Sequence, residues 1–164
     1  MTKVSINPIW SVTEDGTNVL QPKVLELLSL IYSEGNLAKA CKKNNSSYRY
    51  SWNLIKEAEK KLNLYIDEVK KEYKLKNSQI CLSGFSQGCM MSINLGLISN
   101  EEYSCIVGFS GKIIDQENLK SRKKVSTSIL LIHGDSDQVV SPNFMLEAKD
   151  FLIRNNVDIE THLI

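Results

Sequence analysis

The sequence has few of the residues that build metal centres and disulfide frameworks. Its 164 residues include two histidines and four cysteines, and none of the cysteines forms a C-x-x-C pair. Because three of the cysteines lie in apolar segments, we expect reduced core thiols rather than disulfides or a zinc site. We expect neither a metal nor another cofactor. The residues concerned are Cys41, Cys81, Cys89, Cys105, His133 and His162.

Long apolar runs and an excess of one charge are also missing. No segment approaches the roughly 18 to 20 apolar residues that a membrane helix needs, and residues 1–8 lack the apolar stretch of a signal peptide. We therefore expect a cytoplasmic protein without a membrane span. Since 20 basic residues face 19 acidic ones, no net field draws the chain toward nucleic acid or membranes.

The second half of the chain alternates between short apolar runs and helical patterns. The runs lie at residues 79–83, 105–109, 128–132 and 157–164, and they are typical of strands buried on both faces of a parallel sheet. Helical patterns cover about residues 87–98 and 142–155. This order predicts an α/β fold with about four parallel strands joined by right-handed crossovers.

The first half follows a different pattern. Residues 8–20 predict a short hairpin, and residues 22–33 and about 36–43 predict two helices. From Tyr48 the apolar positions follow helical spacing for about 27 residues, without a glycine or proline between Gly35 and Gly84. This pattern predicts either one long helix or two helices that meet around residues 58–63.

A nucleophile motif stands between a predicted strand and a predicted helix. Gly84-Phe85-Ser86-Gln87-Gly88 fits G-x-S-x-G, in which a tight turn exposes the serine hydroxyl. We expect both glycines to be needed because side chains would clash in the turn. Ser86 is then the candidate nucleophile, and the backbone amide of Gln87 would face a developing oxyanion. The alternative is a Gly-Ser turn that only connects strand to helix.

A candidate acid lies in the loop after a later strand, where Asp137 follows Ser86 by 51 residues. The segment His133-Gly-Asp-Ser-Asp137 emerges from the run at 128–132, where a Ser, then Asp, then His order places its acid. Two carboxylates, Asp135 and Asp137, compete for this role on position alone.

These motifs carry a resemblance to a known family. The segments 84–91, 108–111 and 133–142 resemble the phospholipase/carboxylesterase family of α/β-hydrolases, which includes acyl-protein thioesterases, over about residues 60–164. The resemblance implies Ser86 as nucleophile, Asp137 as the acid that orients a histidine, and the Gln87 amide as one oxyanion donor. It implies short-chain carboxylic esters, lysophospholipids or acyl-protein thioesters as substrates.

The resemblance also implies parts that the sequence does not supply. The family's catalytic histidine lies in a Gly-His pair after the last-but-one core strand, whereas this sequence stops at 161–164, inside that predicted strand. We expect His162 to be a structural strand residue and His133 a structural turn residue. The first strands of the family and the loop with its second oxyanion donor are missing too. We therefore expect a partial hydrolase with impaired catalysis.

A second motif lies near the N-terminus. Residues 35–55 have helix-turn-helix spacing, and residues 34–56 hold five basic side chains against Glu34 alone. Lysines there would contact phosphates, and the start of the second helix would reach base edges. The alternative is a helical hairpin with a solvated basic face. The candidate DNA contacts are Lys42, Lys43, Ser46, Ser47, Tyr48 and Arg49.

This segment has its own family resemblance. Residues 8 to about 60 resemble the N-terminal winged-helix domain of molybdate-responsive (ModE-type) and LysR-type regulators, notably at 47–49 and 51–55. The resemblance implies that Trp52 is a core residue. Because hydrolase-like sequence replaces the basic wing, we expect only weak, salt-sensitive DNA binding.

The two resemblances predict two partial domains. Residues 1–60 would form a wingless helix-turn-helix, and residues 61–164 a partial α/β-hydrolase. Three hypotheses follow: an impaired ester hydrolase acting on a small ester or lysolipid, a DNA-binding module of a transcription regulator, and a non-functional fusion remnant. The sequence leaves the oligomeric state open.

Overall fold

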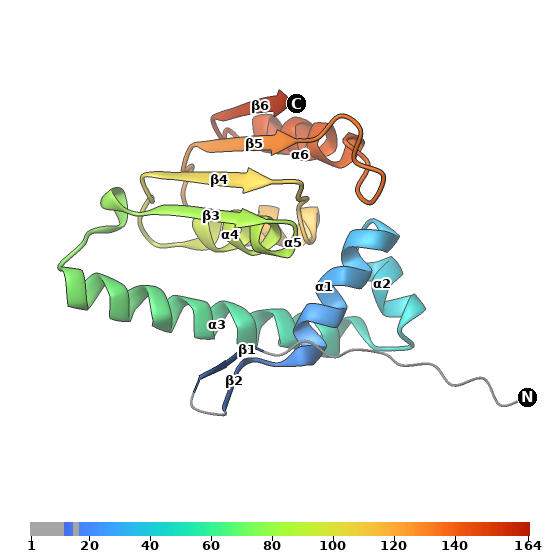
Figure 1. The fold of residues 1–164 in the computed structure, drawn as a ribbon, viewed down its shortest axis with the longest axis horizontal. Helices are drawn as coiled ribbons and strands as arrows, with labels where there is room; N and C mark the ends of the chain where they lie inside the picture. Colours follow the sequence, from blue (N-terminus) through green and yellow to red (C-terminus); the bar gives the residue numbers. More distant parts are fainter. Residues whose placement is uncertain (1–11, 15–16) are drawn as a thin grey trace, which may run out of the picture.

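A computed structural model describes residues 12–14 and 17–164, with side chains from Gln21 onward. A short antiparallel hairpin precedes three helices, and a parallel sheet with three further helices follows (Figure 1). The first half comprises β1 (Val12–Glu14), β2 (Thr17–Leu20), α1 (Pro22–Glu34), α2 (Leu37–Lys43) and α3 (Tyr48–Tyr73). The second half comprises η1 (Asn77–Gln79), β3 (Cys81–Phe85), α4 (Gln87–Ile98), β4 (Cys105–Phe109), α5 (Gln116–Arg122), β5 (Ile129–His133), α6 (Asn143–Arg154) and β6 (Ile159–Leu163).

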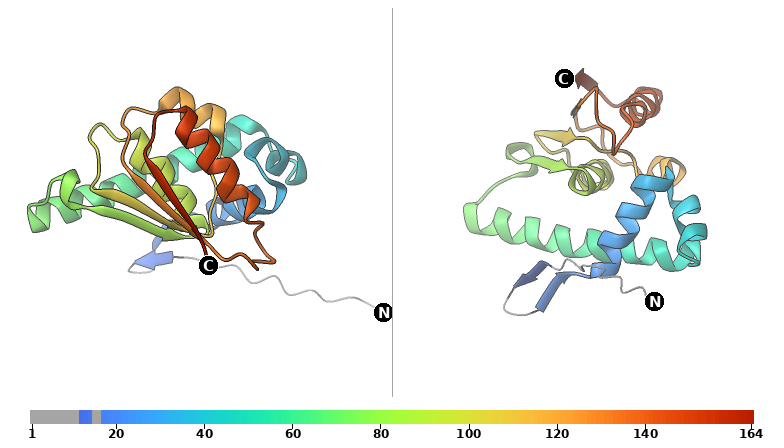
Figure 2. Two further views of the ribbon diagram at one scale, coloured as in Figure 1. Left: turned by 90° about the horizontal axis from the view of Figure 1, so that it is seen from above. Right: turned by 45° about the vertical axis from the view of Figure 1, so that its right-hand side comes forward.

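The four strands of the second half form one parallel sheet in the order β3-β4-β5-β6. Cys81 pairs with Cys105 and Ile106 pairs with Ile129, so neighbouring strands begin at nearly the same height in the sheet. Strand order equals chain order, and right-handed crossovers then place the connecting helices on one face of the sheet. Figure 2 shows α4, α5 and α6 on this face. The predicted α/β fold with about four parallel strands is confirmed.

The expectation that the strands are buried on both faces is wrong. Exposure alternates along β3, and its outward residues include Phe85, which is 70% exposed. All the sheet's crossovers lie on the other side, so the face that carries Cys81 and Phe85 is not covered by them. For the same reason Cys81 is exposed rather than a core thiol, although Cys41 and Cys89 are buried and all four cysteines are free.

Two apolar clusters hold the fold together, and α4 contributes to both. One cluster joins α1, α2 and α3 to Met90 and Met91 of α4 and to Ile114. The other lies between the sheet and its helices and includes Cys89, Ile93 and Leu97 of α4. The first cluster therefore packs the N-terminal helices directly onto the sheet region.

The long pattern after Tyr48 forms one helix rather than two, because α3 runs without a break from Tyr48 to Tyr73. Its N-terminus is capped by the Ser47 hydroxyl, which accepts a hydrogen bond from the Tyr50 amide. Trp52 is buried, as the core role predicted for it requires. None of the described helices combines the length and the apolar character of a bilayer span.

Some expectations differ from the structure in detail. The sequence pattern does not predict helix α5, because Leu119 is the one buried apolar side chain among its seven residues and no helical periodicity results. Helices α2 and α3 follow one another in the chain, and residues 44–47 form the turn between them. Part of the predicted hairpin, residues 8–11 and 15–16, lies outside the described residues.

Candidate active site

Ser86 lies in the sharp turn between β3 and α4. Its backbone has φ 53° and ψ −113°, a conformation that side chains rarely adopt, and its carbonyl accepts the first hydrogen bond of α4 from Met90. Its amide donates to the Phe109 carbonyl at 2.8 Å, which fixes the turn to the end of β4. A strained serine between a strand and a helix is the geometry of a nucleophile elbow.

The two glycines of the motif have different surroundings. A Cβ on Gly84 would overlap the backbone of Gly88 and Cys89, whereas a Cβ on Gly88 would meet nothing within 4 Å. The prediction that both glycines are needed in the turn is therefore wrong for Gly88 within this structure. The sheet side of the elbow adds a further constraint, because Gly108 and Gly111 both leave room for the Cys89 sulfur.

Gln87 begins α4 directly after Ser86. As the first helical residue it has an amide without an intrahelical acceptor, at the positive end of the helix. An oxyanion formed on a carbonyl at Ser86 would lie near this amide. The Gln87 side chain is bound elsewhere: its Nε2 donates to the Leu25 carbonyl at 3.1 Å and to the Ser29 hydroxyl, both in α1.

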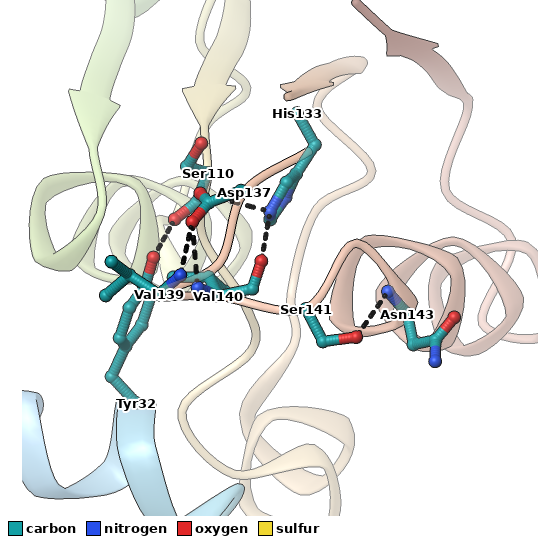
Figure 3. Close-up of polar contacts among 8 residues, drawn as sticks. All are labelled: Tyr32, Ser110, His133, Asp137, Val139, Val140, Ser141 and Asn143. Carbon is teal, nitrogen blue, oxygen red and sulfur yellow. Dashed lines mark hydrogen bonds and ion pairs between the residues drawn. The ribbon is translucent and has the colours of Figure 1, made fainter. Parts of the chain in front are cut away.

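Asp137 lies in the loop after β5, at the carboxyl edge of the sheet. Figure 3 shows its Oδ1 accepting hydrogen bonds from the amides of Val139 and Val140, each at 2.9 Å. These bonds, the Val140 amide foremost, hold the Asp137 pKa below its usual value. The competing Asp135 is exposed and its carboxylate accepts from the Ser136 hydroxyl. Asp137 is therefore the carboxylate that the fold fixes as an anion.

Neither histidine of the described chain contacts Ser86. His133 is buried, with Nε2 3.0 Å from the Val140 carbonyl oxygen and 3.6 Å from Oδ2 of Asp137. His162 is exposed on β6 and pairs with Glu160 at 2.8 Å. Within residues 21–164 no group of three or more His, Cys, Asp or Glu side chains is arranged to hold a metal ion. Asp137 thus lies near His133, whose Nε2 is within hydrogen-bond distance of the Val140 carbonyl.

The site includes a residue that sequence patterns did not indicate. Tyr32 of α1 donates a hydrogen bond from its hydroxyl to the Ser110 carbonyl at 2.8 Å (Figure 3). Burial raises the pKa of Tyr32 above the ordinary value of a tyrosine, and the negative charge of Asp137 raises it further. The contact joins residues 78 positions apart, and Tyr32 shows only helical spacing in the sequence, so no local signal marks it.

The predicted DNA contacts keep mostly exposed side chains at the α2–α3 turn. Lys43 lies 3.9 Å from Glu34, and the Tyr48 hydroxyl donates to Asp115 at 2.7 Å. Ser46 and Ser51 share a hydrogen bond, while Ser47 caps α3. Lys42 and Arg49 are exposed and make no hydrogen bond or ion pair among the described residues. DNA binding by this segment stays a prediction.

Comparison with known proteins gives a family match. A family model described as Phospholipase/Carboxylesterase matches residues 41–164. Acyl-protein thioesterase 1 of Yarrowia lipolytica (strain CLIB 122 / E 150) is 32% identical over 88 residues, which cover 49% of this chain and 39% of that protein. The family match begins inside the segment predicted as a helix-turn-helix, and neither similarity concerns DNA binding.

Solved structures show the same fold. The crystal structure of esterase PE8 matches with a TM-score of 0.65 at 32% identity, over 67% of this chain and 51% of that one. The crystal structure of Arabidopsis thaliana SOBER1 matches with a TM-score of 0.63 at 23% identity, over 68% of this chain and 54% of that one. The matches therefore cover 39% of the length of the thioesterase and about half the length of the two solved structures.

Proposed function

The chain belongs to the phospholipase/carboxylesterase family, and on that basis we propose that it is a serine carboxylic-ester hydrolase with Ser86 as the nucleophile. The observation that carries the proposal is the backbone of Ser86, held at φ 53° between the end of β3 and the N-terminus of α4. Such a turn is costly, of the order of 1 to 3 kcal/mol, and here it presents a hydroxyl beside a free helix amide.

The other roles follow from position. The Ser86 oxygen attacks the carbonyl carbon of an ester, and the negative charge that develops on the carbonyl oxygen is stabilised by the Gln87 amide. Asp137 is the acid that would orient a protonated base, because its fixed carboxylate lies at the same edge of the sheet as Ser86. The proposed substrates are short-chain carboxylic esters, lysophospholipids or acyl-protein thioesters.

We further propose that this chain by itself turns over slowly. A serine hydroxyl needs a base to take its proton, and neither His133 nor His162 bonds to Ser86. In serine hydrolases the loss of the histidine costs on the order of a million-fold in kcat. The rate that is left would come from the Gln87 amide and from binding.

A fluorophosphonate probe tests the proposal, because it forms a covalent bond with an activated serine and needs no turnover. We expect slow labelling of the wild type, mapped to Ser86 by mass spectrometry, and none of Ser86→Ala. Ser78→Ala, at an exposed serine outside the site, is the matched control and should label like the wild type. A folded sample that is never labelled would contradict the proposal and favour the non-functional alternative.

DNA binding is kept as a second proposal for the α2–α3 turn. It is supported by the exposed side chains of Lys42 and Arg49, which form no ion pair within the described part of the chain and could contact phosphates. Tyr48 supports it less, because its hydroxyl already binds Asp115.

A further inference from the structure

Two of the four cysteines lie side by side in the parallel sheet. Strands β3 and β4 are neighbours (Figure 1), and Cys81 is the register partner of Cys105. Neighbouring strands of a sheet lie about 4.8 Å apart, and disulfides join residues whose Cα atoms are about 4.4 to 6.8 Å apart. The backbone therefore holds Cys81 and Cys105 at a separation that a disulfide can bridge.

Both cysteine side chains lie on the same face of the sheet. Leu82 and Ile106, the next residues in each strand, belong to the apolar cluster between the sheet and its helices or pack against it. Because successive side chains of a strand point to opposite faces, Cys81 and Cys105 point away from those helices. Cys81 is exposed and Cys105 is partly buried, whereas the other two cysteines are buried. A dissolved thiol reagent therefore reaches this pair first.

We propose that Cys81 and Cys105 form a reversible disulfide when the chain meets a low-molecular-weight disulfide such as oxidised glutathione. The thiolate of one cysteine attacks a sulfur of oxidised glutathione, which forms a mixed disulfide and releases one glutathione thiolate. The thiolate of the second cysteine then attacks the protein sulfur of the mixed disulfide, so the bond between the two cysteines forms and the second glutathione leaves. The pair loses two electrons and two protons in total, and oxidised glutathione is reduced to two thiols.

The place of the pair separates this reaction from the candidate active site. Cys81 and Cys105 are the first residues of their strands, whereas Ser86 follows the last residue of β3. The bond would therefore join the amino ends of β3 and β4, and its formation needs no hydrolase activity. An exposed disulfide is of the kind that thiol reductants readily cleave, which makes the modification reversible.

Oxidation followed by mass spectrometry tests the proposal. The chain is incubated with oxidised glutathione at about pH 8.5, because desolvation raises the pKa of Cys81 to about 11 and only the thiolate attacks a disulfide. We expect the intact mass to fall by two hydrogen atoms and dithiothreitol to restore it. Digestion after Phe85 and after Glu102 separates Cys81, Cys89 and Cys105, and it should yield peptides that join Cys81 to Cys105.

Three results of this oxidation overturn the proposal. The chain could stay reduced, it could gain one glutathione at each exposed thiol without an internal bond, or it could form disulfides that involve other cysteines or a second copy of the chain. Each would show that the two thiols do not meet within one folded chain.

A variant with one thiol moved is the matched control. Cys81→Ser combined with Ser83→Cys places the thiol two residues further along the same exposed face, opposite Val107. With a rise of about 3.3 Å per residue, its Cα lies about 8 Å from that of Cys105, which is too far for a disulfide. This variant should gain glutathione and form no internal bond. An internal bond formed as readily as in the wild type overturns the proposal.

A bifunctional alkylating reagent tests the pair without oxidation. Dibromobimane becomes strongly fluorescent only when thiols displace both of its bromines. We expect the reduced wild type to give at least about tenfold more fluorescence than Cys105→Ser, because only the wild type offers two accessible thiols side by side. Equal fluorescence from the two chains overturns the proposal. Since this measurement uses the reduced chain, it decides the matter even if the variant with the moved thiol does not fold.

Discussion

The N-terminal helices and the sheet region contribute to the candidate site in different ways. The sheet region supplies Ser86, the Gln87 amide and Asp137 through turns at strand ends, where the backbone itself fixes each group. Helices α1 to α3 supply contacts made by side chains across long stretches of sequence, such as Tyr32 with Ser110. The chemistry is thus encoded locally, whereas what surrounds it depends on how the helices dock.

The largest effect is expected from Gly84→Ala, which alters the turn between β3 and α4 in the sheet region. The new Cβ would overlap the backbone of Gly88 and Cys89, and backbone atoms cannot move aside as a flexible side chain can. We expect a loss of at least about 3 kcal/mol in the free energy of unfolding, measured by urea unfolding, together with loss of fluorophosphonate labelling.

Gly88→Ala is the matched control within the same motif. Nothing lies within 4 Å of its Cβ position, and Gly88 is in α4, where alanine is a better helix former than glycine. The free energy of unfolding should stay within about 1 kcal/mol of the wild type or rise. Equal destabilisation by Gly84→Ala and Gly88→Ala would contradict the expectation that only Gly84 leaves no room for a side chain.

A smaller effect is expected where the two regions meet. Glu59 of α3 is buried, and its carboxylate accepts hydrogen bonds from Nη1 and Nη2 of Arg122 in α5, at 2.8 and 2.6 Å, and from the side-chain amide of Asn94 in α4 at 2.6 Å. Arg122→Met leaves the Glu59 charge buried without its counter-ion and should cost about 3 kcal/mol. The measurement is the urea midpoint at constant m-value.

Two further variants sharpen this result. Lys43→Met removes a surface ion pair of 3.9 Å and should change stability by less than about 0.5 kcal/mol. Glu59→Leu combined with Arg122→Met should recover part of the loss, because no buried charge is left uncompensated. If Arg122→Met lowered the free energy of unfolding as little as Lys43→Met, the ion pair of Glu59 and Arg122 would not stabilise the packing of α3 on the sheet region.

The smallest effect concerns the helices alone. We expect the chain to retard a random DNA duplex weakly at low salt, with binding that fades as salt rises, and Arg49→Ala or Lys42→Ala to weaken it a few-fold in a mobility-shift titration. Lys71→Ala, an exposed lysine at the far end of α3, should leave the shift unchanged. If no mobility shift occurs even at low salt, the proposal that the α2–α3 turn binds DNA is wrong, and the helices have a structural role.

Much of the fold followed from local patterns. Continuous apolar runs located all four sheet strands to within a few residues, and α4 began and ended where helical spacing indicated. The long helix α3 was recognisable because no glycine or proline interrupts its pattern. The candidate nucleophile Ser86 followed from two glycines around a serine between a strand and a helix.

Other features were out of reach of such patterns. A run such as 81–85 has the same composition whether one or both faces of its strand are covered, so the exposure of Cys81 and Phe85 depended on where the crossovers pass. The difference between Gly84 and Gly88 depends on which atoms lie beyond each Cα. The position of Asp137 within 3.6 Å of His133 depended on the actual course of the loop.

The sequence by itself determined the class of fold, the elbow that carries Ser86 and the loop that carries Asp137, because each depends on residues close together in the chain. Only the tertiary structure decided that one face of the sheet is left uncovered by its crossovers. It alone brought α1 to the carboxyl edge and let the Tyr32 hydroxyl donate a hydrogen bond to the Ser110 carbonyl at the end of β4. The physical reason is that packing between distant segments depends on the shapes of both surfaces, which no short stretch of sequence contains.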